Sequence, residues 1–358
     1  MKKTLVVLWS LTMGWHAQAK VYTLFVGSYA PADRPGIYVY NFDADSGGLT
    51  KVSEVAGVEN PSYLAISPDR QRVYAVGENK RERATVSAFA FGQGELRLLN
   101  SQTADGDEPC YLSVAPDGKR VVTANYGGGS VSVLPVAEDG SLSAPPRVFT
   151  FSGTGTVAER QERPHMHSAV FSPEQKYLFA CDLGTDRIYK FDVAEDGLTV
   201  SAPLKTKAGG GVRHLVFHPG GKFAYTTHEL TGEVGVWRYA DGELAPLQTV
   251  AADDGAGEKS GADAHLTPDG KFLYASNRAK TNNLAIFRVA GDGTLTKIGA
   301  QPTGRCPRNF VISPDGKFLL VANQGDDAIQ VFAIAADGEL HDTGKRVTVS
   351  QPVCLKFD

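Results

Sequence analysis

Six side chains that can bind anions or transfer protons occur at or next to matching positions relative to a turn that recurs along this chain. They are His165, His167, Arg213, Glu229, Arg278 and Arg308. A guanidinium group can hold a carboxylate or a phosphate through paired hydrogen bonds. Neighbouring positive charges lower the pKa of a histidine, which keeps its ring neutral and able to accept a proton. This combination predicts a site for an anionic small molecule with a reactive carbonyl group.

Two turn signals alternate along the chain and define the repeat that sets these positions. One is Ser-Pro-Asp-Gly or a close variant, with its proline at positions 68, 116, 173, 219, 268 and 314. The other is a Gly-x-Leu tripeptide, shortened to Gly-Leu at Leu198, which recurs about every 45 to 56 residues with its leucine at Leu49, Leu96, Leu142, Leu198, Leu244, Leu295 and Leu340. Two turn types per repeat imply about four strands per repeat, which is typical of a β-propeller blade.

The segments between the turns favour strands, because they are short, rich in Val, Ile, Tyr and Phe, and bounded by Gly, Pro and Asp. Residues 352–357 match the innermost strand of a repeat whose second strand is missing, whereas residues 21–27 match a second strand without a first. The two ends therefore complete one blade together. We predict an all-β fold, a seven-bladed β-propeller over residues 20–358 that is closed by pairing of the N- and C-terminal strands.

In such a ring the Ser-Pro turns lie on one face, so the opposite strand ends gather around the mouth of the central channel. Counting from each turn proline to that mouth gives further residues that we expect to bind substrate. The expected substrate-binding set is His167, Asn125, Tyr126, Asp182, Asn277, Arg308 and Asn323. The alternative is that Asn and Asp only form turns and that Arg-Glu pairs only hold neighbouring blades together.

The first 19 residues predict a cleaved export signal. Two lysines precede an apolar stretch, and the Ala-Gln-Ala sequence at 17–19 resembles a signal cleavage site. We therefore expect a mature chain that begins at Lys20 and is periplasmic or secreted. The alternative is that this stretch extends the first strand of the fold. No later apolar run approaches about 18 residues, so no membrane anchor is expected.

Charge and cysteine content narrow the range of partners. The chain carries 40 acidic and 36 basic residues, a net charge of -4, and no basic run, so nucleic-acid binding is not expected. Its four cysteines have no metal-like spacing and are too few for a disulfide scaffold. Cys306 and Cys354 are the pair best placed to form a bridge. We expect a monomer that binds a small molecule, without a cofactor or a bound metal.

Several segments of the chain are together similar to the propeller lactonase family, which includes the bacterial propeller-type 6-phosphogluconolactonases and the fungal carboxy-muconate cyclases. They are residues 60–64, 124–130, 164–168, 182–186, 212–219, 229–230, 276–278 and 307–310. The resemblance implies that His165, Arg213, Glu229 and Arg278 are the active-site residues. Two features depart from it. Val212 replaces the usual proline of the family, and export of the chain would separate it from phosphorylated gluconolactone, a cytoplasmic metabolite.

The resemblance implies a metal-free hydrolase that opens a sugar-acid or carboxylated lactone. Either His165 or Glu229 would take a proton from water, and the choice between His165 and His167 stays open. Arg213 and Arg278 would stabilise the oxyanion and hold the anionic group of the substrate. We expect replacement of Arg213 or Glu229 by Ala to abolish activity with little effect on the melting temperature.

Two other functions are compatible with the same residues. The first is a non-catalytic propeller that binds a ligand or a protein in the cell envelope. The second is a calcium-dependent lactonase, in which Glu229, Asn125, Asn277 and Asp182 supply oxygen ligands.

Overall fold

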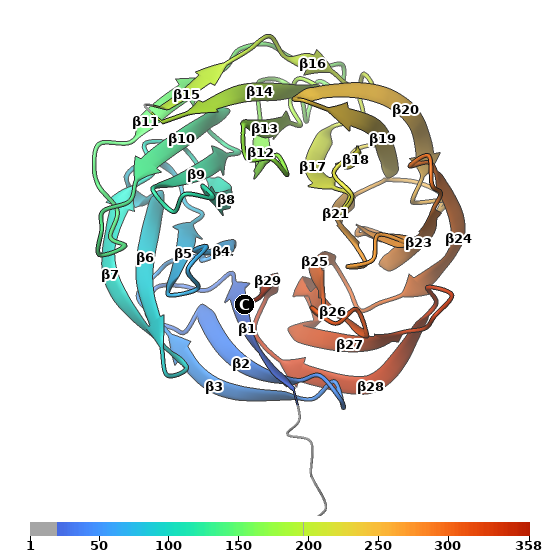
Figure 1. Cartoon of the computed structure of the whole chain (residues 1–358), viewed down its shortest axis with the longest axis horizontal. Coiled ribbons are helices and arrows are strands. Elements are labelled where there is room, and N and C mark those ends of the chain that lie inside the picture. Colours follow the sequence, from blue (N-terminus) through green and yellow to red (C-terminus); the bar gives the residue numbers. More distant parts are fainter. Residues whose placement is uncertain (1–19, 196) are drawn as a thin grey trace, which may run out of the picture.

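Seven antiparallel sheets are arranged radially around a central channel (Figure 1). The computed structural model of the chain describes residues 20–195 and 197–358. The predicted export signal, residues 1–19, lies outside the described residues. The described part has two 3-10 helices, Arg81–Arg83 and Gln324–Asp326, and is otherwise built of strands and turns. The prediction of a seven-bladed all-β propeller is confirmed.

The first three blades run from the channel to the rim in the following order. Blade 1 consists of β29 (Pro352–Phe357), β1 (Val21–Ser28), β2 (Ile37–Asp43) and β3 (Leu49–Val55). Blade 2 consists of β4 (Leu64–Ile66), β5 (Arg72–Gly77), β6 (Thr85–Gly92) and β7 (Glu95–Thr103). Blade 3 consists of β8 (Pro109–Val114), β9 (Arg120–Asn125), β10 (Ser130–Pro135) and β11 (Arg147–Thr150).

The remaining four blades repeat this order, and one of them has an additional strand. Blade 4 consists of β12 (Met166–Phe171), β13 (Tyr177–Asp182), β14 (Arg187–Ala194) and β15 (Gly197–Val200), with β16 (Leu204–Lys205) also paired to β14. Blade 5 consists of β17 (Val212–Phe217), β18 (Phe223–His228), β19 (Glu233–Ala240) and β20 (Glu243–Ala251). Blade 6 consists of β21 (Gly261–Leu266), β22 (Phe272–Asn277), β23 (Asn283–Val289) and β24 (Leu295–Pro302). Blade 7 consists of β25 (Pro307–Ile312), β26 (Phe318–Asn323), β27 (Ala328–Ile334) and β28 (Leu340–Thr348).

The two ends of the chain close the ring, as predicted. β29 pairs with β1 in antiparallel register, with Leu24 opposite Phe357 and Val26 opposite Leu355. Leu24, Val26 and Leu355 are fully buried. Since β29 lies on the channel side of β1, it covers the edge of β1, which would otherwise template association with another chain.

Tyrosine hydroxyl groups join the second strand of one blade to the Gly-x-Leu hairpin of the next. Tyr225 in blade 5 donates a 3.0 Å hydrogen bond to the carbonyl of Gly293 in blade 6, and the pairs Tyr74–Gly140 and Tyr274–Gly338 repeat this contact. Gly293 has a φ of 86°, and a Cβ atom there would lie 2.3 Å from Phe223. Backbone conformation and packing both require glycine at this position.

Each inner strand of blades 3, 4, 5 and 7 contains one extra residue near its start. In β12, Met166 pairs with Asp182 and Ser168 pairs with Cys181, which leaves His167 outside the ladder. The equivalent extra residues of the other three strands are Cys110, Arg213 and Arg308. A β-bulge of this kind redirects the extra side chain. Three of these four residues, His167, Arg213 and Arg308, are ones that the turn spacing predicted at the mouth of the channel.

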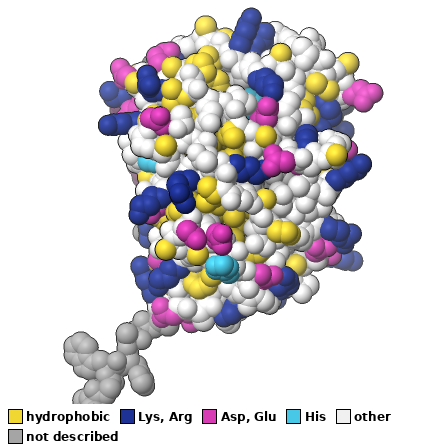
Figure 2. Space-filling view, turned by 90° about the vertical axis from the view of Figure 1, so that its right-hand side faces the viewer, with side chains coloured by type: hydrophobic (Ala, Val, Ile, Leu, Met, Phe, Trp, Pro, Cys, Tyr) yellow, Lys and Arg dark blue, Asp and Glu magenta, His cyan; other side chains and the backbone are white. Residues whose placement is uncertain are grey.

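The outer surface carries charges of both signs. Figure 2 shows Lys and Arg side chains interspersed with Asp and Glu over the side of the ring that it presents. All four cysteines are free, so Cys306 and Cys354 do not form a disulfide. Among the described residues, no helix has the length and apolar character needed to span a membrane.

Removal of residues 352–358 is expected to abolish cooperative folding, because blade 1 would lose its inner strand and expose the edge of β1 to other chains. Leu355→Ala is a graded comparison and should lower the free energy of unfolding by about 2–5 kcal/mol. Thermal melting and size-exclusion chromatography of both variants test this. A truncated chain that stays soluble and melts cooperatively would show that closure by β29 is dispensable.

Candidate active site

One buried carboxylate at the mouth of the channel contacts three guanidinium groups. Glu229 follows β18, and only 6 % of its surface is exposed. Its Oε2 atom lies 2.8 Å from Nη2 of Arg278 and 3.1 Å from Nε of Arg213. Its Oε1 atom lies 2.6 Å from Nη2 of Arg160. Three of the four residues predicted as catalytic therefore meet at one point, together with an arginine that the sequence analysis had not named.

The arginines determine the charge state of Glu229. Burial opposes its ionisation, but Arg278, Arg213 and Arg160 outweigh this and lower its pKa to about 2. Burial, followed by repulsion from Arg278 and Arg308, lowers the pKa of Arg213 to about 10, which still leaves that side chain cationic at neutral pH. A carboxylate so strongly held is a weak proton acceptor. Its position favours orientation of the arginines over activation of water.

A histidine and an aspartate of the inner strands hold Arg213 in place. Arg213 Nη1 donates to the carbonyl of Ala262 at 2.8 Å and lies 3.1 Å from Nε2 of His214. The opposite ring nitrogen of His214, Nδ1, lies 2.8 Å from Oδ1 of Asp263. Burial and the charge of Arg213 lower the pKa of His214 to about 4, so its ring is neutral at neutral pH. A neutral ring donates to Asp263 through Nδ1 and accepts from Arg213 through Nε2.

His165 lies on the same face of the ring, and both of its ring nitrogens contact neighbouring groups. Its Nδ1 atom is 3.0 Å from the carbonyl of Tyr126, and its Nε2 atom is 3.2 Å from Oε1 of Glu162. The imidazole stacks on the ring of Tyr126 with 4.4 Å between centroids. Its backbone N–H donates to Asp182 at 2.7 Å, and Asp182 also accepts from the N–H of Gly184. Asp182 thus fixes the loop that carries His165.

His167 occupies the bulge of β12 and lies closer to the channel. Its Nδ1 atom is 3.7 Å from Sγ of Cys110, and its ring centroid is 5.4 Å from that of His214. Burial, followed by Arg213 and His214, holds the pKa of His167 well below its usual range. Both predicted histidines are therefore at the mouth, where His165 is tied to loop residues and His167 is a neutral side chain within the channel.

Arg308 of blade 7 also lies at the channel mouth, where it lines a small cavity together with Arg213. The guanidinium carbon of Arg308 lies 5.6 Å from the centroid of the Tyr29 ring. Within the part of the chain that the structure describes, Arg308 forms no ion pair and donates no hydrogen bond. Attraction to Tyr29, Glu78 and Glu229 outweighs burial and raises its pKa. Arg308 is thus a permanent cation whose donors remain available to an anionic group.

Three of the predicted substrate-binding residues donate hydrogen bonds from their side-chain amides to other residues of the same blade. The amide nitrogen of Asn125 donates to Ser130 and Ser132, that of Asn277 donates to Asn283, and that of Asn323 donates to Gln330. These bonds join the end of a second strand to the following third strand. We therefore correct this part of the expectation, because the turn spacing locates backbone positions at the mouth but does not show where an amide points.

Five residues of the site were missed by the sequence analysis. They are Tyr29, Glu78, Arg160, His214 and Asp263. Glu78 stands ten residues after a turn proline, the same spacing that identified Glu229, so the register places it at the mouth without indicating a role for it. Arg160 comes from the long loop between β11 and β12, where no repeat pattern marks a position.

The described residues include no group of three or more His, Cys, Asp or Glu side chains placed to hold a metal ion. Two of the four residues of the predicted calcium site already bind other groups of the protein. Glu229 contacts three arginines, Oδ1 of Asp182 accepts the backbone N–H of His165, and Oδ2 of Asp182 accepts the hydroxyl of Thr185. These donors do not form a cation site in this arrangement.

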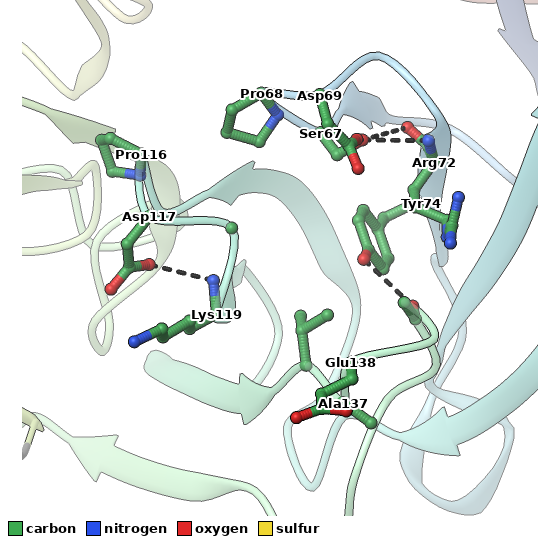
Figure 3. A pocket seen from close by; sticks show the side chains of 13 residues that line it. Ser67, Pro68, Asp69, Arg72, Tyr74, Pro116, Asp117, Lys119, Ala137 and Glu138 are labelled. Atoms are coloured by element: carbon green, nitrogen blue, oxygen red, sulfur yellow. Dashed lines mark hydrogen bonds between the residues drawn. The ribbon is translucent and has the colours of Figure 1, made fainter.

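A larger hollow lies between blades 2 and 3 on the opposite face of the ring (Figure 3). Its polar groups include turn residues that bond to their own turn. Ser67 accepts the N–H of Arg72 at 2.9 Å, and Asp117 accepts the N–H of Lys119 at 2.9 Å. The hollow has no histidine, and its carboxylates and cations serve the turns. The channel mouth is therefore the better candidate.

Replacement of Glu229 is expected to destabilise the protein, which revises the expectation of an unchanged melting temperature. Three guanidinium groups would be left around a neutral side chain. The difference between its usual pKa of 4.5 and about 2 in the folded chain corresponds to about 3 kcal/mol. Because the folded-state pKa is depressed, this stabilisation is complete above about pH 4.5 and is lost as the pH falls to about 2.

Denaturant unfolding of Glu229→Gln across this range tests the assignment, and the gap to wild type should narrow between these two pH values. Glu243→Gln is the matched control, because Glu243 pairs with Lys190 on the surface and should contribute less than about 1 kcal/mol. Equal, pH-independent stability of wild type and Glu229→Gln would contradict a charged, paired Glu229.

Comparison with known proteins agrees with the fold. The chain matches the family described as lactonase, 7-bladed beta-propeller, over residues 23–357. It is 39 % identical to a 6-phosphogluconolactonase of Formosa agariphila, over 86 % of this chain and 91 % of that protein. It is 36 % identical to a 6-phosphogluconolactonase of Bacillus subtilis, over 94 % and 98 % of the two chains.

A solved structure gives the same result. The periplasmic gluconolactonase of Pseudomonas aeruginosa superposes with a TM-score of 0.89 and 36 % identity, and the match covers 94 % of this chain and 99 % of that one. The prediction of a lactone-opening hydrolase is confirmed at the level of the family. The chain belongs to the seven-bladed β-propeller lactonases.

Proposed function

We propose that this protein hydrolyses gluconolactone-type and carboxylated sugar lactones outside the cytoplasm. The observation that carries the proposal is the convergence of Arg160, Arg213, Arg278 and Arg308 on one mouth of the channel, three of them in ion pairs with Glu229. Four cations outnumber the carboxylates of Glu229 and Glu78 there, and this excess attracts a negatively charged substrate and stabilises the oxyanion that forms when water attacks a carbonyl.

The small cavity at the mouth divides the arginines into two pairs. Arg160, whose side chain is 40 % exposed, and Arg278 lie outside the lining of this cavity, so we assign them to the anionic group of the substrate. Arg213 is 3 % exposed and lines a small cavity together with Arg308. We assign these two to the oxyanion. Glu229 keeps three of the four guanidinium groups in position before the substrate arrives.

The proposed location rests on the first 19 residues and affects the choice of substrate. Phosphorylated gluconolactone is formed in the cytoplasm, whereas an exported enzyme meets lactones of the cell envelope. The relation to a periplasmic gluconolactonase is consistent with this. We therefore propose gluconolactone-type and carboxylated sugar lactones as substrates, and a monomer as the active form.

Export predicts a defined N-terminus. The chain recovered from the envelope or the medium should begin at Lys20 by intact mass, because the Ala-Gln-Ala sequence at 17–19 provides the cleavage site. A variant in which Ala17 and Ala19 are replaced by Asp should retain residues 1–19. Wild-type protein found in the cytoplasm with these residues attached would refute the proposed location.

Arg160→Ala tests the proposed function. We expect KM to rise about tenfold for phosphorylated and carboxylated lactones, with kcat nearly unchanged and little effect on uncharged gluconolactone, because Arg160 contacts only the anionic group in this assignment. Arg163→Ala is the matched control, since Arg163 lies on the same loop and pairs with Glu162 on the surface. Proton release is followed at constant pH, with and without a chelator.

The same measurement separates the alternatives. Wild-type protein that binds lactones without accelerating their opening would indicate a binding module. A rate lost with chelator would indicate a metal-dependent enzyme. Equal effects of Arg160→Ala on charged and uncharged lactones would remove the assignment of Arg160.

A further inference from the structure

Glu78 is a partly buried carboxylate of the mouth, and its surroundings differ from those of Glu229. It follows β5 of blade 2 in the register position that Glu229 occupies in blade 5. The hydroxyl of Tyr29 donates to both of its carboxylate oxygens, at 3.0 and 2.9 Å, and the hydroxyl of Ser62 donates to Oε2 as well. No guanidinium group forms an ion pair with Glu78 within the described residues.

A small cavity connects this carboxylate with the arginines. Its lining includes Glu78 and Ser62 of blade 2, Cys110 of blade 3, Arg213 of blade 5 and Arg308 of blade 7. The cavity has a volume of about 10 Å³, which is room for about one water molecule. A buried water needs two to four polar partners, and the carboxylate, the Ser62 hydroxyl and the two guanidinium groups can supply them. The cavity thus places a nucleophile-sized space between a carboxylate and two cations.

The surroundings of Glu78 raise its pKa. Burial is the largest influence and raises its pKa, Glu108 adds to this, and Arg308, Ser62 and Tyr29 oppose it without cancelling it. A carboxylate with a raised pKa accepts a proton more readily than Glu229 does. Because its two partners are hydroxyl groups, which can donate or accept, the protonated form also keeps its hydrogen bonds.

The other groups that face this cavity keep one protonation state near neutral pH. Burial raises the pKa values of Tyr29 and Cys110, so both stay protonated. Arg213 and Arg308 remain cationic. His214, whose pKa is about 4, stays neutral. Glu78 is therefore the group of this cavity with a protonation equilibrium closest to the working pH.

We propose that Glu78 is the catalytic residue that accepts the proton of the attacking water in lactone opening, an inference that rests on the proposed function. One proton of the water passes to the Glu78 carboxylate while the water oxygen bonds to the carbonyl carbon. The electron pair of the carbonyl bond moves to its oxygen, which becomes an oxyanion beside Arg213 and Arg308. When the oxyanion collapses, the bond from this carbon to the ring oxygen breaks, and the ring oxygen takes the proton from Glu78. The new carboxylic acid releases its proton to the solvent.

The decisive variant is Glu78→Gln, which is nearly isosteric and cannot accept a proton. We expect kcat to fall about 10²- to 10⁴-fold with a small change in KM. In the wild type, kcat should fall tenfold per pH unit below the pKa of Glu78, and this acidic limb should be absent in the variant. Glu78→Asp should restore part of the rate and keep the limb.

Tyr29→Phe provides an independent test that leaves the carboxylate in place. The Tyr29 hydroxyl stabilises the ionised form of Glu78, so its removal should shift the acidic limb to higher pH by about one unit. Glu174→Gln is the matched control, because Glu174 also accepts a hydrogen bond from a tyrosine, Tyr239, but lies in the Ser-Pro turn of blade 4 on the opposite face. It should leave kcat and the limb unchanged.

The outcomes distinguish a failure of the proposed function from a failure of the proposed role of Glu78. If wild-type protein accelerates no lactone, both the proposed function and the role of Glu78 are refuted. If the wild type is active and Glu78→Gln retains its kcat, only the role of Glu78 is refuted. If Glu78→Gln does not fold, as judged by melting, an acidic limb that Tyr29→Phe leaves unmoved overturns the inference, and a limb shifted upward supports it.

Discussion

The functional face of this propeller depends on one carboxylate that is buried among three guanidinium groups. Glu229, Arg213, Arg278 and Arg160 come from the end of β18, the bulge of β17, the turn after β22 and the loop before β12. An unpaired charge at this depth would be strongly destabilising, whereas the group together satisfies its members. Because distant segments must meet for the charges to be compensated, assembly of the ring and assembly of the site are one process.

Two glutamates in equivalent positions of the ring have opposite properties because their neighbours differ. Guanidinium groups keep Glu229 ionised, and hydroxyl groups beside Glu78 accommodate either protonation state. Active sites commonly use two carboxylates in this way, with the environment setting the role of each. Here the repeat supplies the same backbone geometry twice, and the side chains of neighbouring blades determine which carboxylate holds charge and which exchanges a proton.

The sequence predicted the fold almost completely because turns carry strong local signals. The Gly-x-Leu and Ser-Pro turns determined the number of blades, and the unmatched ends revealed how the ring closes. The same spacing placed Arg213, Glu229 and Arg278 together. It could not show that the amide of Asn125 turns back into its own blade, or that Arg160 crosses from a loop without a repeat, since both depend on packing between segments far apart in sequence.

The bulges of the inner strands have a consequence for how such a protein diversifies. A residue outside the hydrogen-bond ladder takes no part in strand pairing, so exchanging its side chain leaves the register of the sheet intact. Cysteine, histidine and two arginines already occupy this position in four of the blades. Evolution can therefore vary the chemistry of the pore one residue at a time while the scaffold is conserved, which offers an explanation for how a single architecture accommodates several unrelated reactions.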